Sequence, residues 1–396
     1  MDLFDKCTNF TIADELIKKG IYPYFHALET KQGPEVVMEG ISEIMLGSNN
    51  YLGLTSHEEV IEAGRKALLQ YGSGCSGSRF LNGTTKLHLQ LEKELAEFLH
   101  KDECVTFSTG FQTNLGIISA IVGRNDYIFC DKDNHASIYD GCKLSYAKDI
   151  LRFKHSDMDD LEKQLQTVPL ESGKLIVTDG IFSMGGDICK LPDIVRLAKK
   201  YNARTMVDDA HSFGVIGEGG RGTASHFHLE KEVDIIMGTF SKSLASIGGF
   251  MAANKSVCNF IKHNSRPYAF CASITPASVE CARAALKIIK REPQRIKRLQ
   301  EVADYARKKL IEKHVDIKNS QAPIIPINTF DNEITFLACH RLFERGVYVN
   351  PVISPAVPVG QSMIRTSYMA TLTNEQIDKA TDIIAQVLGE LNLLKK

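Results

Sequence analysis

Short apolar runs alternate with amphipathic segments through the first three quarters of the chain. The apolar runs, which read as strands, are residues 104–107, 126–130, 175–178, 205–207 and 235–237. The last three are typical of strands buried in a parallel sheet. Helical periodicity predicts helices between the runs, at 58–71, from 111 to 121 and at 191–201. This alternation predicts an open α/β sheet with functional residues at the carboxyl ends of its strands.

The pattern changes near residue 292. Residues 295–314 form one long, charged, amphipathic segment, strand-like pieces marked by proline follow, and a last helix is expected from residue 374. We therefore predict an N-terminal arm (1–55), a large domain with a mostly parallel sheet flanked by helices (56–285), and a smaller C-terminal α+β domain (286–396).

Composition excludes several classes of protein. Of 396 residues, 43% are hydrophobic and 24% charged, and the net charge is −1, so nothing favours general binding to nucleic acid or anionic lipid. No apolar run approaches the ~18 residues of a membrane helix. The start MDLFDKCTNF lacks the order of a secretory signal. We expect a cytoplasmic protein without a transmembrane segment.

Ten cysteines are scattered from Cys7 to Cys339, with no CxxC pair and no Cys/His group at zinc spacing. We expect reduced and mostly buried thiols, and no metal site. Cys75 and Cys271 lie in motif regions and are expected near a site without acting as nucleophiles.

Lys242 follows a predicted strand in the sequence Thr239-Phe-Ser241-Lys242-Ser243. A lysine among small hydroxyl residues can form a Schiff base with an aldehyde cofactor, and the hydroxyls can donate to a phosphate. Taken alone, a surface lysine in a loop is the commoner explanation.

Asp208 and His211 follow another strand, in Asp208-Asp209-Ala210-His211. A carboxylate there can keep a pyridine nitrogen protonated, and a histidine three residues later can reach the ring's phenolic oxygen. A helix-capping turn or a pair of metal ligands would fit the same four residues.

Two further features sit after strands. Residues 108–111 (STGF) open a helix whose free N–H groups can bind phosphate, although an ordinary helix cap looks the same. His135 can stack on an aromatic ring, although a lone histidine is more often a surface or capping residue. Together the four features supply the amine anchor, nitrogen partner, phosphate cradle and stacking lid of a pyridoxal phosphate (PLP) site.

The sequence resembles the α-oxoamine synthases, PLP enzymes of the aspartate aminotransferase fold type, from about residue 11 to 373. The segments that carry the resemblance are SNNYLGL (48–54), GSRFLNGT (77–84), STGFQTN (108–114), HASIYDG (135–141), TDGIFSMGGD (178–187), VDDAHSFGVIG (207–217) and TFSKSLASIGG (239–249). Within the family, GCSGSRFLNGT (74–84), GTASHF (222–227), NPVISPAVP (350–358) and MIRTSYMATLT (363–373) look most like the soluble bacterial serine palmitoyltransferase branch.

The resemblance implies a role for each matching residue. The cofactor-binding residues it implies are Gly110, Phe111, His135, Ser183, Asp208, His211, Thr239, Ser241 and Lys242, with Ser273 and Thr275 reaching the phosphate of a neighbouring subunit. The catalytic residues it implies are Lys242, His135, Asp208 and His211. Asn49, His135 and Arg365 are implied to contact the amino-acid substrate, and Arg365 is implied to bind the carboxylate of that substrate. Shared sites imply a homodimer.

The activity implied is the decarboxylating condensation of L-serine with a long-chain acyl-CoA, with Lys242 moving the α-proton. Peripheral membrane contact is compatible with a lipid-like product. Four alternatives remain at this point: 8-amino-7-oxononanoate synthase, 2-amino-3-ketobutyrate CoA ligase, an aminotransferase of the same fold, and a non-catalytic subunit. The presence of Lys242, Asp208 and His211 argues against the last.

Overall fold

The computed structural model describes residues 2–395 and divides the chain into two compact units. Unit 2 comprises residues 49–300, and unit 1 combines the residues up to 48 with those from 301 onward. The sequence prediction instead separated residues 1–55 as an arm and placed a boundary at 285. Those domain boundaries rest on local pattern rather than on contacts, and they stay predictions.

Unit 2 is built on a seven-stranded sheet with the order β3-β9-β8-β7-β6-β4-β5. Its strands are β3 (Glu103–Phe107), β4 (Tyr127–Asp131), β5 (Asp149–Phe153), β6 (Lys174–Asp179), β7 (Arg204–Asp208), β8 (Ile235–Thr239) and β9 (Gly249–Ala253). Strands β5, β4, β6, β7 and β8 pair in parallel, and β9 is antiparallel to both β8 and β3. The predicted, mostly parallel sheet is therefore confirmed.

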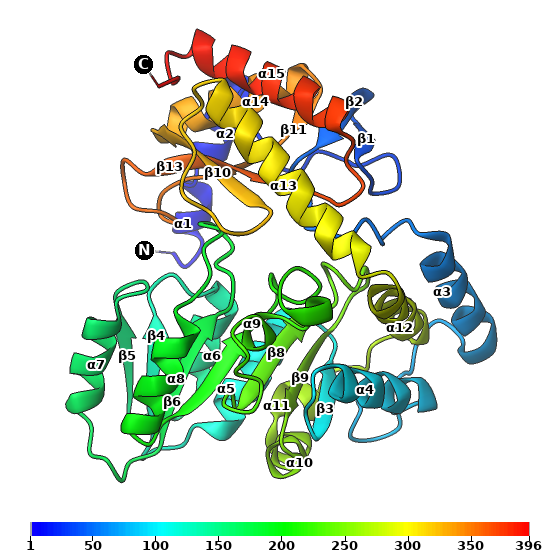
Figure 1. Cartoon of the computed structure of the whole chain (residues 1–396), viewed down its shortest axis with the longest axis vertical. Helices are drawn as coiled ribbons and strands as arrows, with labels where there is room; N and C mark the ends of the chain where they lie inside the picture. Colours follow the sequence, from blue (N-terminus) through cyan, green and yellow to red (C-terminus); the bar gives the residue numbers. More distant parts are fainter. Residues whose placement is uncertain (1, 396) are drawn as a thin grey trace. The chain divides into compact units, whose positions relative to one another are not determined.

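Helices cover both faces of this sheet (Figure 1). The helices of unit 2, of which α3 packs on α12, are α3 (Glu58–Tyr71), α4 (Lys86–Phe98), α5 (Gly110–Ile121), α6 (Ala136–Leu144), α7 (Met158–Gln166), α8 (Leu191–Lys200), η1 (Glu218–Gly220), α9 (Thr223–His226), α10 (Lys255–Asn264), α11 (Arg266–Ala269) and α12 (Pro276–Arg291). One apolar cluster packs α5, α6 and α10 on the sheet, and a second packs α7, α8 and α9. The periodic segments predicted at 58–71 and 191–201 correspond to α3 and α8.

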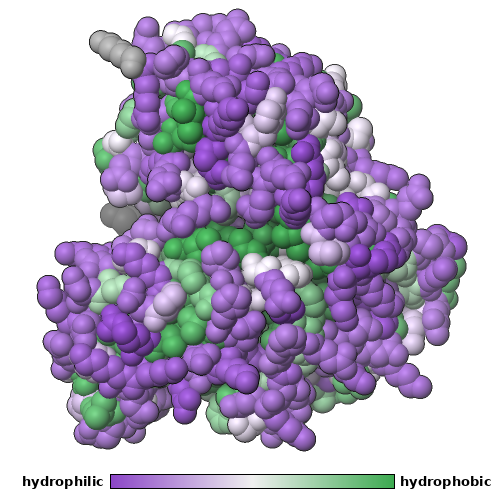
Figure 2. Space-filling view, viewed as in Figure 1, coloured by the Kyte–Doolittle hydropathy of each residue, from purple (hydrophilic) through white to green (hydrophobic). Residues whose placement is uncertain are grey.

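Amphipathic helices explain why the sheet is buried on both faces. All residues of β6, β8 and β9 are buried, and α8 turns Leu191, Ile194 and Leu197 toward the core. The opposite sides of such helices carry polar residues. Figure 2 accordingly shows a largely hydrophilic surface over the helices of unit 2, interrupted by small hydrophobic patches.

Unit 1 contains two three-stranded sheets, β1-β2-β11 and β10-β13-β12. Its elements are α1 (Asp5–Thr8), α2 (Ile12–Lys18), β1 (Glu35–Met38), β2 (Ile41–Met45), β10 (Ile324–Phe330), α14 (Asn332–Glu344), β11 (Val347–Tyr348), β12 (Asn350–Val352), β13 (Ser362–Ser367) and α15 (Asn374–Glu390). The division between the units falls inside α13 (Gln294–Glu312). The predicted helices at 295–314 and from 374 correspond to α13 and α15.

The cysteine prediction is confirmed in part by burial. All ten thiols are free, and Cys104, Cys130, Cys142, Cys189, Cys258 and Cys339 are buried.

None of the helices within residues 2–395 is long and apolar enough to cross a lipid bilayer.

Candidate active site

A cavity of about 310 Å³ opens at the carboxyl edge of the seven-stranded sheet. The predicted cofactor residues that line it are Gly110, Phe111, His135, Ser183, Asp208, His211, Thr239, Ser241 and Lys242. Each lies at or just after the carboxyl end of β3, β4, β6, β7 or β8. Because these strands run in the same direction, their ends meet at one edge of the sheet. The fold thus brings together residues more than 130 positions apart in the sequence.

One corner of the cavity can bind an anion. Thr109 caps α5 by accepting a hydrogen bond from Gln112 N at 3.1 Å, which leaves the first N–H groups of the helix directed outward. A Cβ on Gly110 would lie 2.6 Å from Thr239 Oγ1, so only glycine allows the helix start to approach β8. The hydroxyls of Thr239 and Ser241 are 2.9 Å apart beside it. This corner has the donors that a phosphate group needs.

The acidic wall of the cavity is formed by Asp208 and Asp179, which are paired in register on β7 and β6. Asp208 is only 3% exposed, and it accepts hydrogen bonds from Asn114 Nδ2 at 2.7 Å and Ala210 N at 2.9 Å. Burial and the neighbouring charge of Asp208 raise the pKa of Asp179 well above its usual value. The two carboxyl groups therefore have different electrostatic environments, and the protonated form of Asp179 is favoured.

Two histidines border the same cavity. His135 caps α6, and its Nδ1 lies 2.7 Å from Ser137 Oγ. Burial lowers its pKa, Asp208 opposes this effect, and Lys242 adds to it, so the neutral imidazole is favoured. His211 is buried, and its Nδ1 lies 2.7 Å from the hydroxyl of Tyr51. Both rings are thus held by a hydroxyl group.

Lys242 lies in the tight connection between β8 and β9. Ala245 N donates to Lys242 O at 3.0 Å, and Ser246 N donates to Phe240 O at 3.0 Å. Ala245 adopts the left-handed conformation with φ of 52°. The turn holds the lysine at the cavity wall.

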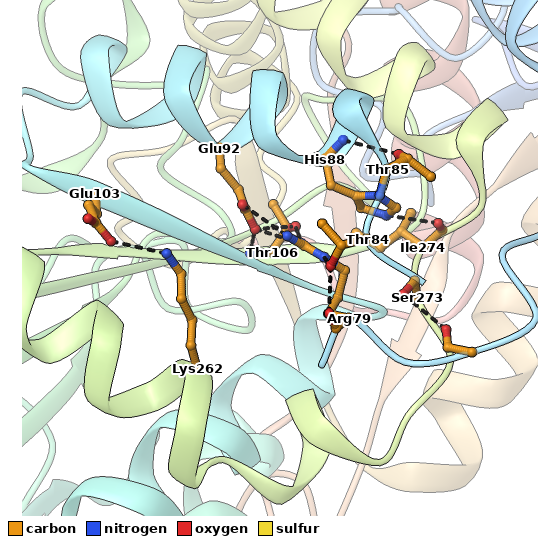
Figure 3. Close-up of polar contacts among 11 residues, drawn as sticks. Arg79, Thr84, Thr85, His88, Glu92, Glu103, Thr106, Lys262, Ser273 and Ile274 are labelled. Carbon is orange, nitrogen blue, oxygen red and sulfur yellow. Dashed lines mark hydrogen bonds and ion pairs between the residues drawn. The ribbon is translucent and has the colours of Figure 1, made fainter. Parts of the chain in front are cut away.

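Ser273 and Thr275 do not line the cavity of their own chain. Ser273 donates from N and Oγ to Gly77 O at 2.9 and 3.1 Å, and Thr275 caps α12. The surrounding network is shown in Figure 3 and includes His88 Nε2, which is 3.0 Å from Ile274 O. The predicted contact of Ser273 and Thr275 with a second subunit stays a prediction.

The same network holds a buried ion pair. Arg79 donates to Glu92 through Nη1 at 2.7 Å and Nη2 at 3.0 Å, and its Nη1 also donates to Thr106 Oγ1 at 2.7 Å (Figure 3). Arg79 and Glu92 are 7% and 6% exposed. The pair fixes the segment with the sequence GSRFLNGT to α4 and β3.

Asn49 and Arg365, the remaining predicted substrate contacts, are not among the cavity-lining residues. Asn49 Oδ1 accepts from Tyr51 Oη at 3.4 Å. Arg365 lies on β13 in unit 1, is 7% exposed, and pairs in register with Asn350 and Pro326. Their contact with substrate stays a prediction.

Sequence reasoning missed several cavity residues, among them Asn114, Ser137 and Asp179. Asp179 ends β6 just as Asp208 ends β7, so the argument used for Asp208 could have found it. Asn114 lies within α5, where nothing in the local pattern separates it from a solvated asparagine.

The chain is similar to known proteins over nearly its full length. The model of the family described as "Aminotransferase class I and II" matches residues 41–384. A serine palmitoyltransferase of Bacteroides thetaiotaomicron is 52% identical over 392 residues, which cover 99% of each protein. An 8-amino-7-oxononanoate synthase of Thermoanaerobacter pseudethanolicus is 40% identical and covers 96% of each.

A solved structure gives the same result. The serine palmitoyltransferase from S. paucimobilis, with a bound PLP–myriocin aldimine, superimposes with a TM-score of 0.95. The two chains are 35% identical, and the match covers 100% of both. Together with the family match, this confirms the resemblance and the fold drawn from the sequence.

Proposed function

The chain belongs to the class I and II aminotransferase family, and we propose that it is a PLP-dependent serine palmitoyltransferase. The reaction condenses L-serine with palmitoyl-CoA and gives 3-oxosphinganine, CoA and carbon dioxide. One carbon–carbon bond forms, while the thioester C–S bond and the bond to the serine carboxyl group break. The observation that carries the proposal is the cavity that joins Lys242, Asp208, His135 and an anion-binding helix start.

The residues of the cavity fit the cofactor. Lys242 would anchor its aldehyde carbon, Asp208 would pair with its ring nitrogen, and the start of α5 with Thr239 and Ser241 would hold its phosphate. His135 would cover the ring, and His211 and Ser183 would face its phenolic oxygen. When bound, the cofactor supplies an electron sink for the negative charge left at the substrate's α-carbon. The hydrogen bonds from Asn114 Nδ2 and Ala210 N support this assignment, because they hold the Asp208 side chain in place at the cavity wall.

The chain's own side chains would then handle the substrate. Lys242 removes the α-proton of serine as a general base, since it lies at the wall of the cavity that would hold the substrate. His135, favoured as the neutral imidazole, can accept or donate a hydrogen bond at the substrate carboxylate. Arg365 offers the planar fork of donors that a carboxylate requires, and Asn49 lies near the bound amino acid.

The proposal extends to assembly and location. Two copies form a homodimer in which Ser273 and Thr275 of one subunit contact the phosphate bound by the other. The protein acts in the cytoplasm, with peripheral membrane contact where its lipid-like product leaves.

Substrate preference tests the proposal. The purified protein is incubated with L-serine, L-alanine or glycine, each with palmitoyl-CoA or a pimeloyl thioester, and thiol release is followed. Serine with palmitoyl-CoA should give the highest rate. Preference for alanine with the pimeloyl thioester would identify an 8-amino-7-oxononanoate synthase, the activity named for relatives about 40% identical.

A further inference from the structure

His155 lies between two loops that carry cavity residues. Its Nδ1 is 3.0 Å from Asp131 Oδ1, and its Nε2 is 3.0 Å from Asp187 Oδ2. Asp131 is the last residue of β4, and Asp187 lies in the connection after β6. His155 itself follows β5, so its ring joins the ends of three neighbouring strands.

This geometry defines the protonation state of the ring. Both nitrogens face carboxylate oxygens, which only accept hydrogen bonds, and a neutral imidazole has one N–H group. Two good hydrogen bonds therefore require the imidazolium. Burial alone would lower the pKa of His155, but its bonds to Asp131 and Asp187 raise it to about 10. Asp133 adds a third carboxylate, with Oδ2 at 3.8 Å from Nδ1.

The same group could be taken for a metal site, because ligand atoms of Asp131, Asp133 and His155 lie within 4.8 Å of one another. A metal-bound histidine must offer a lone pair and so must be neutral. Here both ring nitrogens are already directed at carboxylates. The arrangement fits a buried cation between anions better than a set of ligands.

The first loop leads to His135. Asp131 accepts from Asp133 N and Ser156 N, each at 2.9 Å, and so fixes the backbone where the loop leaves β4. At its other end, His135 N donates to Asp179 Oδ2 at 2.9 Å. The loop is thus anchored on both sides of the four-residue step from Asp131 to His135.

The second loop leads to Ser183. Phe182 N donates to Asp187 O at 3.0 Å, and Gly186 N donates to Phe182 O at 2.8 Å, so residues 182–187 form a closed turn. Ser183 is in this turn and lines the cavity. The ring of Phe182 meets the His155 ring edge-on, with centroids 4.5 Å apart. His155 therefore contacts the turn through both a charge and a ring.

We propose that His155 is a positioning residue: as an imidazolium bridging Asp131 and Asp187, it holds Ser183 and His135 in place at the cavity wall. The activity readout below rests on the proposed function. The spectroscopic readouts do not, because they report the ring of His155 and the bound cofactor alone.

The first experiment compares His155→Gln and Asp187→Asn with the matched control Asp133→Asn, which removes a nearby carboxylate outside the two short bonds. A displacement of the cavity wall by about 1 Å can reduce activity roughly 10- to 100-fold. We expect at least a tenfold loss of kcat/KM for L-serine in the first two variants, and a shifted visible absorbance band of the bound cofactor. Asp133→Asn should stay within about twofold of wild type and keep the wild-type band.

The second experiment observes the ring directly. In the holoenzyme labelled with ¹⁵N-histidine at pH 8.5, the signal lost in His155→Gln should report two protonated nitrogens, whereas an ordinary histidine with a pKa near 6.5 is neutral. The proposal would be overturned if one nitrogen of the His155 ring is unprotonated, or if His155→Gln and Asp133→Asn have equal activities. Loss of the wild-type absorbance band after treatment with EDTA would also overturn it. If wild type releases no thiol with serine, the proposed function fails, while the nitrogen signals and the absorbance band still decide the role of His155.

Discussion

The carboxyl edge of the seven-stranded sheet in unit 2 and the β1-β2-β11 sheet in unit 1 both bury a carboxyl group, in opposite ways. Asp208 is 3% exposed and accepts two hydrogen bonds, from Asn114 and Ala210. Glu43, on β2, is 0% exposed, and neither of its carboxylate oxygens has a hydrogen-bond partner within residues 2–395. Burial without donors raises the pKa of Glu43 to about 8.

The difference separates two consequences of burial. An unpartnered buried carboxyl group keeps its proton at neutral pH, since the charged form loses its hydration. A buried carboxylate that accepts hydrogen bonds can retain its charge for use in a site. The cavity therefore depends on the donors around Asp208 as much as on Asp208 itself, and the following variants test this contrast.

Glu92→Gln should have the largest effect, because Glu92 is the buried counter-charge of Arg79. It accepts from two Arg79 nitrogens, and from Thr106 N and Oγ1 at 2.9 Å. The variant leaves Arg79 buried without a counter-charge, so unfolding free energy measured with urea should fall by about 3–5 kcal/mol. The control Glu62→Gln removes an exposed carboxylate paired with Arg65 and should leave the urea midpoint unchanged. Equal urea midpoints for Glu92→Gln and Glu62→Gln would contradict the expectation that a buried, hydrogen-bonded carboxylate contributes more than an exposed one.

Asp208→Asn should cost activity rather than stability. The side chains have the same size, but the variant removes the negative charge proposed to face the cofactor's ring nitrogen. Loss of one such electrostatic contact typically lowers kcat by about 10²–10³-fold. Thiol release measures the activity, and far-UV circular dichroism during heating checks the fold. A variant with wild-type kcat would show that the charge of Asp208 is not used.

The fold was largely predictable, because strands buried on both faces of a sheet are short apolar runs. Such runs can be recognised without knowing which strands they pair with. The runs at 175–178, 205–207 and 235–237 lie inside β6, β7 and β8. Strand β5 was missed, since this edge strand has the sequence DILRF with Asp149 and Arg152 exposed. Strand β9, with the sequence GFMAA, was missed because glycine and alanine are weak strand formers.

The site was predictable where a chemical group follows a strand, as for Lys242, Asp208 and His135. It was not predictable where a residue acts through a contact across the fold. Asn114 and Asp208 are 94 residues apart, and no local pattern announces their 2.7 Å hydrogen bond. Likewise, nothing in the local sequence around Arg365 predicts whether its side chain reaches the substrate.

Asn114→Ala tests whether the hydrogen-bond donors around the buried Asp208 are needed. Asn114 Nδ2 donates to Asp208 Oδ2 and to Ser137 Oγ at 2.8 Å, so alanine leaves one oxygen of Asp208 without its side-chain donor. Removing a hydrogen bond to a charged group costs about 1.5–3 kcal/mol, which corresponds to a loss of roughly 10- to 100-fold in kcat/KM. Thiol release over a range of serine concentrations gives this ratio. Asn134→Ala is less suitable as a control because Asn134 also anchors β6, whereas Gln164→Ala on α7 lies away from the cavity and should stay near wild type. A kcat/KM for Asn114→Ala within twofold of that of Gln164→Ala would show that Asp208 needs no side-chain donor.

Glu43→Gln tests the buried carboxyl group that has no hydrogen-bond partner within the described residues. This variant should have the smallest effect, a gain in unfolding free energy that depends on pH. The pKa of Glu43 is about 8 in the folded protein, against an ordinary value near 4.5. Between these values the unfolded chain releases the proton and the folded protein keeps it, so wild-type stability falls as pH rises from 4.5 to 8. Glutamine does not titrate and escapes this loss, but its amide is still buried without partners, so the net gain at pH 8 should be about 1–2 kcal/mol. Urea unfolding at pH 5 and pH 8 measures the gain, with Glu35→Gln on the exposed side of β1 as the control. An equal gain at both pH values would mean that Glu43 is charged in the folded protein, and the contrast with Asp208 would then lie in packing rather than in protonation.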